Sequence, residues 1–380
     1  MLEKEAAERT CHGLDDLLDD LLERIGEIQT SHPGNKAIQS FDPDYYHRLS
    51  PQLQKRLLDC MRSGIQNPDS DMGCYARFFD DYEILNPFFA KVIARHHGEN
   101  QHGNHCSDWH IKKLGNNPQL DISRLGLPLL SLRIRVGRNF NDLPLTSAMK
   151  RSDRLNLEDR MVQVFDQLQS QPGLSGTYGS LTPGHANQLS KQEHQTLIKD
   201  HIMFKDMDSD PYLAAAGIAG DWPFGRGCYY SYDRKFVVWV GEEDHLRIMY
   251  MDTATSLKPI LDKLHSALKA MENASSGEFA FSSSYGFVTT CPTNLGTGMR
   301  ASAHIQLPNL TKDGSVDRVR EIADPIGLSV RGLGGEHTPI GQDGTVDISP
   351  RARLYVTEGQ IVSKLFDGLK LLKEAEDSQG

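Results

Sequence analysis

The hydrophobic pattern of this 380-residue chain changes near residue 125, and this change constrains the fold more than any other feature. Before it, apolar residues recur at helical spacing, as in LDDLLDDLLERIGEIQ at 14–29. Ser50-Pro51 then offers a helix N-cap followed by proline at the first helical position. Because strand-like alternation is absent before residue 125, we predict that the first part of the chain is helical.

Beyond residue 125, strand-like and helix-like segments alternate. Short turns between strands, such as GEEDH at 241–245, favour an antiparallel sheet, and Thr357 with Gln360 forms a capping box for a last helix. The predicted fold class is therefore α+β, with a small all-α N-terminal domain followed by a larger domain with an antiparallel β-sheet flanked by helices. The expected strands are 127–138, 236–240, 246–251, 287–291, 302–307, 328–332 and 345–349, and the expected helices between them are about 153–171, 190–202, 256–273 and 313–324.

Composition excludes several function classes. The net charge is −10, which argues against broad nucleic-acid binding because such binding relies on a surplus of Lys and Arg. No apolar run approaches the length of a membrane span, and the charged start MLEKEAAERT is unlike a secretory signal. We therefore expect a cytoplasmic protein that binds neither nucleic acid nor membrane. Six scattered cysteines without a CxxC pair argue against a disulfide framework.

Five arginines lie on or at the ends of predicted strands, where side chains two residues apart share one face. On one sheet they could converge on a polyanion, because arginine binds phosphate through paired hydrogen bonds. Surface salt bridges with the surplus acids explain the arginines equally well. The five are Arg133, Arg135, Arg247, Arg300 and Arg331.

Two glycine-rich loops, 294–300 and 331–341, can bring backbone N–H groups close to an anion. Neither matches GxxxxGK[ST] or GxGxxG followed by a helix, which disfavours a P-loop enzyme. The carboxylates of the turn at 241–245, together with Glu336 in the second loop, could hold a cationic group such as guanidinium. A solvated hairpin turn is the alternative explanation for those carboxylates.

Cys291 lies in TTCPTNLGTGMR, with Thr293 two residues on and Arg300 at the end of the run. Thr293 can hydrogen-bond a thiolate, and nearby arginines would lower the pKa of the thiol. The alternative is an inert buried cysteine. The histidine cluster at 96–110 could bind zinc, but its spacing matches no standard zinc-ligand pattern. The polar stretch at 98–120 around it indicates a linker or a long surface loop.

Seven ordered segments resemble signatures of the phosphagen kinases, or ATP:guanidino phosphotransferases. CPTNLGTGMR resembles their CP[ST]NLGT motif, SLRIRVGR resembles S-x-R-V-R-x-G-R, and FVVWVGEEDHLRI resembles F-L-V-W-V-N-E-E-D-H-L-R-I. KDHIMF, DWPFGRG, SGIQNPDSDMGCYA and RGLGGEHT are similar to D-D-H-x-x-F, W-P-x-x-R-G, the N-domain substrate loop and the flexible loop of the arginine-kinase branch. The resemblance covers about residues 40–375 and implies reversible transfer of the ATP γ-phosphoryl group to a guanidine nitrogen.

The resemblance also implies a division into domains. It predicts a helical N-terminal extension over 1–40, an all-α N-domain with the substrate-specificity loop over 41–110, a linker over 111–125 and a catalytic α+β domain over 126–380. The implied partners are ATP or ADP and a small guanidino compound. We expect a monomer rather than a dimer.

On the nucleotide side, the resemblance implies that the five arginines bind the phosphates and the phosphoryl group in transfer, with Arg247 also catalytic. His201 and His304 would lie beside the adenine and ribose. Mg²⁺ would accompany ATP or ADP and be held mainly by the phosphates and water, with Glu242 as a candidate ligand through water.

On the guanidine side, Glu243 and Glu336 would hold the guanidinium in line with the γ-phosphorus, and either could accept its proton. Cys291 would be a thiolate beside it. Glu243, Cys291 and Glu336 would therefore bind the substrate as well as take part in catalysis. The N-domain loop would contribute Ser70, Met72, Gly73 and Tyr75.

The substrate within the family is predicted from three features. The loop at 67–75 is short and Glu336 matches the arginine-kinase type of flexible loop, which together favour L-arginine. Asp71 and His96 depart from the arginine-kinase pattern, and a protonated His96 could meet a sulfonate, which leaves taurocyamine as the alternative. A catalytically inactive nucleotide-binding homologue is disfavoured, because the arginines, both glutamates and the cysteine are all present.

Overall fold

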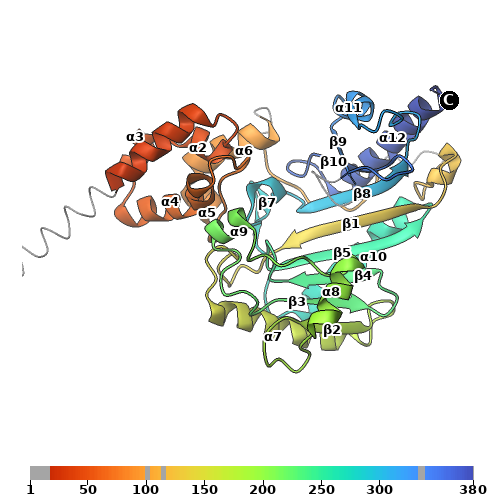
Figure 1. The fold of residues 1–380 in the computed structure, drawn as a ribbon. Coiled ribbons are helices and arrows are strands. Elements are labelled where there is room, and N and C mark those ends of the chain that lie inside the picture. Colours follow the sequence, from red (N-terminus) through yellow and green to blue (C-terminus); the bar gives the residue numbers. More distant parts are fainter. Residues whose placement is uncertain (1–17, 99–102, 113–116, 333–338, 380) are drawn as a thin grey trace, which may run out of the picture.

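The computed structural model describes residues 18–98, 103–112, 117–332 and 339–379. A group of short helices lies beside a larger domain built on a twisted antiparallel sheet, so the predicted α+β class is confirmed (Figure 1). Over these residues, no helix combines the length and the apolar character that crossing a bilayer requires.

The N-terminal helices begin where the sequence places capping residues. The hydroxyl of Ser50 accepts a hydrogen bond from the backbone N–H of Leu53 at 3.4 Å, as predicted for this N-cap. Asp42 caps the preceding helix in the same way through its carboxylate, again just ahead of a proline. The helices span residues 18–31, then α2 (Lys36–Ser40), α3 (Pro43–Arg48), α4 (Pro51–Gln66), α5 (Asp81–Ile84) and α6 (Asn86–His97).

The sheet of the large domain has eight strands, and every neighbouring pair is antiparallel. Its central strand β1 (Leu130–Arg138) lies between β5 and β8, so segments more than a hundred residues apart become neighbours. The order is β2-β3-β4-β5-β1-β8-β10-β9, with β2 (Gly176–Ser180), β3 (Gly227–Ser231), β4 (Phe236–Val240), β5 (Leu246–Ala254), β8 (Met299–Gln306), β9 (Leu328–Arg331) and β10 (Thr345–Pro350); β6 (Phe281–Ser282) and β7 (Gly286–Phe287) form a separate small hairpin.

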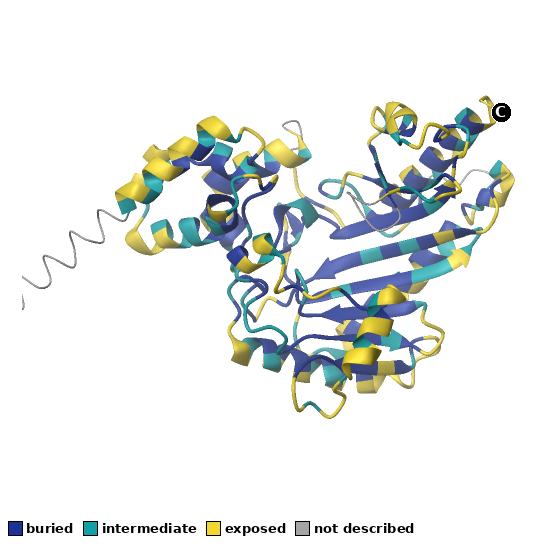
Figure 2. Ribbon diagram, viewed as in Figure 1, coloured by how far each residue is buried: buried dark blue, intermediate teal, exposed yellow. Residues whose placement is uncertain are grey.

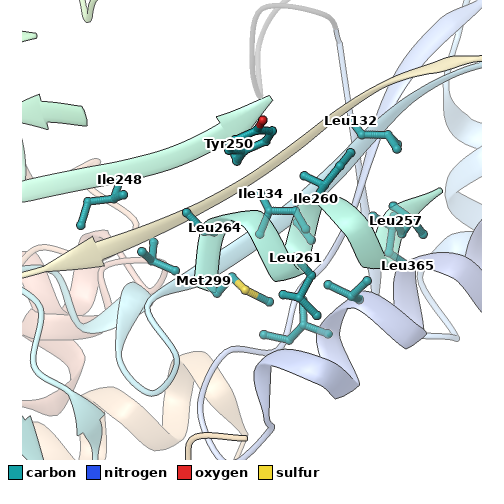
Figure 3. Close-up of a cluster of buried hydrophobic side chains, with 14 of the residues drawn as sticks. Leu132, Ile134, Ile248, Tyr250, Leu257, Ile260, Leu261, Leu264, Met299 and Leu365 are labelled. Carbon is teal, nitrogen blue, oxygen red and sulfur yellow. The ribbon is translucent and has the colours of Figure 1, made fainter. Parts of the chain in front are cut away.

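One face of the sheet is covered by long helices, and the other carries polar side chains on its central strand and a second apolar cluster that includes Val237, Trp239 and Met249. In β1, Leu132 and Ile134 point into the core against α10, together with Tyr250 of β5 and Met299 of β8 (Figure 3). Because side chains alternate along a strand, the residues between these apolar ones face the opposite side. The helices are α7 (Arg151–Leu168), α8 (Lys191–Lys199), α9 (Pro211–Ala216), α10 (Leu257–Ala274), α11 (Asp317–Ala323) and α12 (Glu358–Asp377), with 3-10 turns η1 (Ile122–Leu125) and η2 (Pro292–Asn294).

The last helix confirms its predicted capping box. The Thr357 hydroxyl accepts from the N–H of Gln360, and the Gln360 side chain accepts from the N–H of Thr357. Figure 2 shows the resulting burial pattern, with dark central strands and helices that are exposed only along their outer faces.

Two parts of the predicted sheet differ from the structure. The strand expected at 287–291 is wrong beyond Phe287, because the backbone groups there bond to other elements. The Tyr82 hydroxyl donates to the carbonyl of Thr289, and the carboxylate of Asp244 accepts from the N–H of Thr290. Strands β2 and β3 were not predicted, since GTYGS and GCYYS are short and glycine-containing and lack clear alternation.

The N-terminal helices and the large domain share a hydrophobic cluster. Tyr82 and Phe89 of the helices pack with Tyr285, Val288 and Cys291 of the large domain. Residues 105–111 lie against the large domain, where the carboxylate of Glu358 accepts from the N–H of Asp108 at 2.9 Å. The predicted domain boundaries remain predictions.

Candidate functional site

Strand register brings the predicted arginines together on the face of the sheet opposite the core helices. Arg135 of β1 lies directly opposite Arg300 of β8, and Arg133 lies opposite Ser302. Arg247 of β5 pairs with Gly137, two residues along β1 from Arg135, so it shares their face. Arg331 of β9 lies opposite Asp347 of β10. All five predicted arginines therefore lie on one face of four adjacent or nearly adjacent strands.

Arg133 and Arg135 are cations without protein partners in the described part of the chain. Neither side chain makes a hydrogen bond or an ion pair there. Burial, and then the like charges of Arg133 and Arg247, hold the pKa of the Arg135 guanidinium well below its ordinary value. Burial likewise lowers the pKa of Arg133. A bound polyanion would relieve this electrostatic stress, which makes the face a candidate phosphate site.

Arg300 is held by protein acceptors. Its Nη2 forms an ion pair with the buried carboxylate of Asp347, and its Nε donates to the hydroxyl of Ser349 at 3.1 Å. Burial lowers the pKa of Arg300 to about 10, against the opposing effect of Asp347. The Oδ1 atom of Asp347 lies 3.8 Å from Nε2 of His304. Asp347 therefore joins the arginine face to one of the two predicted histidines.

Arg247 and Glu243 form the junction between the arginine face and the carboxylates. Nη2 of Arg247 lies 3.0 Å from Oε2 of Glu243 and 3.1 Å from Oε2 of Glu242. Burial raises the pKa of Glu243 to about 7, although Arg247 opposes this shift and Glu242 adds to it. A second hydrogen bond reaches Oε2 of Glu243 from Nδ2 of Asn294 at 3.1 Å. Glu243 can thus exchange a proton near neutral pH.

Cys291 lies beside these groups, but its pKa differs from the prediction. Its Sγ is 3.1 Å from the Thr293 hydroxyl, which is the predicted contact. The thiol is 4% exposed, and burial followed by the charge of Glu243 raises its pKa above the ordinary value. The prediction that nearby arginines lower this pKa is therefore wrong for the ligand-free protein. Among the neighbouring charges, that of the Glu243 carboxylate has the largest effect on the pKa of the thiol.

The predicted substrate loop meets the carboxylates across a pocket of about 500 Å³. Ser70, Met72 and Tyr75 line it from the N-terminal side, and Glu242 and Glu243 line it from the sheet. Tyr75 is near enough to Cys291 and Glu243 that both charges, after burial, raise the pKa of its hydroxyl. Further lining comes from Asp69, Asp71, Asp210, Tyr212 and Leu213.

Gly73 shapes the loop and does not line the pocket. Its φ is +76°, a backbone conformation that favours glycine, and its carbonyl accepts from the N–H of Gly64 at 2.8 Å. A Cβ on Gly73 would meet the side chain of Asn35 at 2.3 Å. The hydroxyl of Ser70 accepts from the N–H of Gly73 at 3.0 Å. Both residues therefore set the conformation of the loop.

The two predicted histidines lie near each other beside the arginine face. His304 pairs with Ser131 across β8 and β1, and the charge of His201 is among the influences that lower its pKa, after burial and others. His201 is exposed in a turn that Trp239 anchors, because Trp239 Nε1 donates to the carbonyl of Ile202 at 2.6 Å. Glu336 lies outside the described residues, as does much of the loop that carries it.

Sequence reasoning missed three residues of this site: Asp347, Asn294 and Arg353. Asp347 lies on an alternating strand, and its pairing with Arg331 across a hairpin was the available signal. Asn294 belongs to the CPTNLGT segment but was read only as part of a loop. Arg353 lies in an irregular segment between β10 and α12, where no periodic pattern indicates which way a side chain points. Its Nη1 donates to the carbonyl of Thr293 at 3.0 Å.

Comparison with protein families accounts for this arrangement. Residues 44–94 match the model of the ATP:guanido phosphotransferase N-terminal domain, and residues 156–379 match the C-terminal catalytic domain of the same family. The chain belongs to the ATP:guanido phosphotransferase family. The predicted resemblance to phosphagen kinases is thereby confirmed.

Individual relatives of this phosphotransferase include arginine kinases and other guanidino kinases. The chain is 38% identical to the arginine kinase of Limulus polyphemus over 315 residues, 82% of this chain and 83% of that protein. It is 35% identical to the arginine kinase of Artemia franciscana over 338 residues, 88% and 90% of the two chains.

Solved structures extend the likeness. The duplicated taurocyamine kinase of Schistosoma mansoni, with bound transition-state analogue components, matches 94% of this chain at 29% identity and a TM-score of 0.80. The phosphotransferase spans 48% of that duplicated chain, about half its length. A lombricine kinase matches at 28% identity and a TM-score of 0.79, over 91% of this chain and 92% of that one.

Proposed function

We propose that the protein is an arginine kinase, which transfers the γ-phosphoryl group reversibly between ATP and the guanidino group of L-arginine. The observation that carries this proposal is the pair Arg133 and Arg135. They are cations without protein partners in the described residues, and the charge of Arg135 acts on the carboxylate of Glu243, which in turn acts on the thiol of Cys291. A polyanion and a cation can therefore meet across one site, as this transfer requires.

The nucleotide side supplies charge neutralisation. Phosphoryl transfer depends on positioning and electrostatic stabilisation more than on covalent chemistry. Arg133, Arg135 and Arg300 would bind the phosphates, and Arg247 and Arg331 would reach the phosphoryl group in transfer. Because Asp347 and Ser349 already hold Arg300 in place, this guanidinium needs little reorganisation when the nucleotide binds. His201 and His304 would lie beside the adenine and ribose.

The guanidine side supplies orientation and a proton acceptor. Glu243 would accept hydrogen bonds from the guanidinium and take the proton that the attacking nitrogen loses, a role suited to its pKa of about 7. Glu336 would hold the opposite side of the guanidinium. Cys291 would contact the guanidinium through its sulfur, and the incoming positive charge would favour the thiolate.

Mg²⁺ would accompany the nucleotide. Glu242 suits a supporting role, because Oε2 accepts from the N–H of Glu243 at 2.8 Å and pairs with Arg247, while Oε1 has no hydrogen-bond partner among the described residues. A bound Mg²⁺ neutralises phosphate charge. Glu242 would receive a hydrogen bond from one of its water ligands.

L-arginine is favoured by the character of the pocket and by the relatives. The end formed by the substrate loop is lined by Asp69, Asp71 and Asp210. These carboxylates, of which Asp71 pairs with Lys36, offer an anion for the α-ammonium group of L-arginine. The relatives from Limulus polyphemus and Artemia franciscana are arginine kinases.

Taurocyamine is the alternative substrate, because the Schistosoma mansoni structure of similar fold is a taurocyamine kinase. The sequence argument for it relied on a protonated His96. His96 is an exposed residue that does not line the pocket. Partial desolvation, followed by the charges of His97 and Lys36, lowers the pKa of its ring to about 4, so the ring is neutral at pH 7. A neutral imidazole has no charge with which to attract a sulfonate, which favours L-arginine.

The test is a coupled assay of ADP formation with Mg-ATP and L-arginine, taurocyamine, creatine and glycocyamine. We expect the highest kcat/KM for L-arginine. A tenfold preference for taurocyamine would overturn the substrate assignment, and binding of ATP without turnover of any guanidine would support an inactive homologue. A cytoplasmic location and a monomeric state remain part of the proposal, and size-exclusion chromatography with light scattering tests the second.

A further inference from the structure

Arg353 connects the loop of the thiol to the carboxylate of Glu243. Its backbone carbonyl accepts from the N–H of Thr297 at 2.9 Å and from the Thr297 hydroxyl at 3.2 Å. Its Nη1 donates to the carbonyl of Thr293 at 3.0 Å and to Oδ1 of Asn294. Main chain and side chain of one residue therefore hold both ends of the loop that follows Cys291.

Asn294 lies between Arg353 and Glu243. Its Oδ1 accepts from Arg353, and its Nδ2 donates to Oε2 of Glu243 at 3.1 Å. A guanidinium is only a donor and an ionised carboxylate only an acceptor, so the amide satisfies both neighbours in one orientation alone. If the amide turned over, its NH₂ group would face a cation and its oxygen would face a carboxylate. Arg353 thus determines which end of Asn294 reaches Glu243.

We propose that Arg353 is a positioning residue for the proton acceptor, which fixes Glu243 through the amide of Asn294. Oε2 of Glu243 then receives hydrogen bonds from two sides, from Asn294 at 3.1 Å and from Arg247 at 3.0 Å. With that oxygen held by protein donors, Oε1 is the oxygen left to face the substrate guanidinium. This inference rests on the proposed function, because it assumes that Glu243 binds the guanidine.

The remaining donors of Arg353 raise one competing possibility. Its Nε is buried and has no hydrogen-bond partner in the described structure. Burial and the charge of Arg331 lower the pKa of Arg353 to about 10, while Cys291 and Glu243 act in the other direction. A direct contact between Arg353 and the transferring phosphoryl group would use these free donors. The experiment below separates direct contact from positioning.

The experiment is a double-mutant cycle with Arg353→Ala, Asn294→Ala and the double variant, measured as kcat/KM for L-arginine. Loss of a hydrogen bond to a charged group predicts a decrease of about ten- to one-hundred-fold in each single variant. The double variant should lose no more than either single variant, because both remove the same relay. Additive losses, or no loss in Asn294→Ala, would overturn the proposal.

Two further readouts exclude a merely structural lesion and a direct phosphate contact. The acidic limb of the pH profile of kcat/KM should move upward in both single variants, since Glu243 loses a donor that favours its ionised form. The shift should be at least as large in Arg353→Ala, because this variant also removes a positive charge that interacts with Glu243. The KM for ATP should stay unchanged. A KM for ATP that rises in Arg353→Ala alone would identify a phosphate contact and refute the positioning role.

Arg351→Ala is the matched control, because Arg351 lies two residues away and forms an exposed ion pair with Asp324. It should keep normal activity and pH profile. If Arg353→Ala fails to fold, Asn294→Ala still tests the relay, because it leaves the contacts of Arg353 to Thr293 and Thr297 in place. If the unsubstituted enzyme turns over no guanidine, the proposed function fails by itself. The relay is then tested by the pH dependence of the unfolding temperature, which Asn294→Ala should alter and Arg351→Ala should not.

Discussion

The proposed nucleotide half and the proposed guanidine half of the site are built in different ways. The nucleotide half lies on one sheet, and strand register alone places Arg135 beside Arg300. The guanidine half is assembled from three separate segments, which carry Tyr75, Glu243 and Cys291. A sheet fixes charges rigidly before the ligand arrives, whereas segments from two domains can move relative to one another.

The arginines in and beside the site are of two kinds. Arg138, next to the site on β1, donates to the carbonyls of Gly137 and Thr297 at 2.8 and 2.9 Å and lies over the ring of Phe287. Arg135, three residues earlier, has no such acceptors among the described residues. Arg138 thus stabilises the fold, whereas Arg135 carries a positive charge that no protein group in the described part of the chain neutralises, as the proposed phosphate site requires.

Exchanging the two arginines for alanine should have the largest effect and should separate these roles. We expect Arg135→Ala to lower kcat by about one-hundred- to one-thousand-fold, the usual effect of removing a preorganised donor. Its unfolding temperature should not fall, because like charges nearby repel. Arg138→Ala should instead lower the unfolding temperature, since it leaves two buried carbonyls without a donor. Steady-state kinetics and thermal unfolding check both, and the same pattern in the two variants would contradict the division.

Glu243→Gln tests the carboxylate that is the proposed proton acceptor in the guanidine half. We expect kcat/KM for the guanidine to fall by about one-hundred-fold through loss of the proton acceptor. In the unsubstituted protein kcat/KM should rise as the pH passes through about 7, the pKa of Glu243, and the variant should lack this limb. A variant that retained the limb would show that another group titrates there.

The same variant has a predictable effect on stability. The folded state raises the pKa of Glu243 from 4.5 to about 7, so it binds more protons than the unfolded state between these values. The resulting stabilisation is complete below pH 4.5 and is lost as the pH rises through about 7. Glutamine does not titrate in this range. The unfolding temperature of the variant should therefore rise relative to that of the unsubstituted protein as the pH increases from 5 to 8.

The contrast between the halves explains how much the sequence could predict. Alternation in SLRIRVGR places Arg133 and Arg135 on the face opposite Leu132 and Ile134, which requires no knowledge of tertiary structure. Helix caps at Ser50 and Thr357 were predicted for the same reason, since they depend on local sequence. Local periodicity is thus sufficient to place Arg133 and Arg135 on one face, whereas the position of Arg300 opposite Arg135 depends on strand register.

Tertiary contacts decided the features that sequence reasoning missed or misjudged. The segment after Phe287 alternates like a strand, but its backbone bonds to Tyr82 and Asp244 from distant segments. The pKa of Cys291 depends on burial and on Glu243, and neither can be read from the residues next to the thiol. Arg353 reaches the site from an irregular segment, where the sequence has no period to analyse.

Cys291 provides a smaller test of the guanidine half. Cys291→Ala should lower kcat by about tenfold, the effect expected for one lost contact to a charged group. In a Cys11→Ser, Cys106→Ser background, which removes the exposed thiol of Cys106 and the thiol of Cys11 outside the described residues, alkylation of the ligand-free protein should be slow at pH 7 and should accelerate up to pH 9. An alkylation rate that levels off below pH 7 would mean that the arginines, and not burial with Glu243, set the pKa of the thiol.

The smallest expected effect concerns the far end of the guanidine pocket, where Asp71 pairs with Lys36. Asp71→Asn should weaken the binding of L-arginine, because the α-ammonium group loses a nearby anion. The same change should favour taurocyamine, because its sulfonate is no longer repelled by the Asp71 carboxylate. The ratio of kcat/KM for the two substrates should therefore shift toward taurocyamine, by less than about tenfold because the Asp71 carboxylate is exposed. Because dissolved ions screen exposed charges, this change in the kcat/KM ratio should become smaller as the salt concentration is raised from a low value to about 1 M. His96→Gln is the matched control: a ring with a pKa of about 4 carries no charge at pH 7, so the ratio should stay unchanged. A larger change in His96→Gln than in Asp71→Asn would reverse the argument, because the specificity of the pocket would then depend on the imidazole and taurocyamine would become the better assignment.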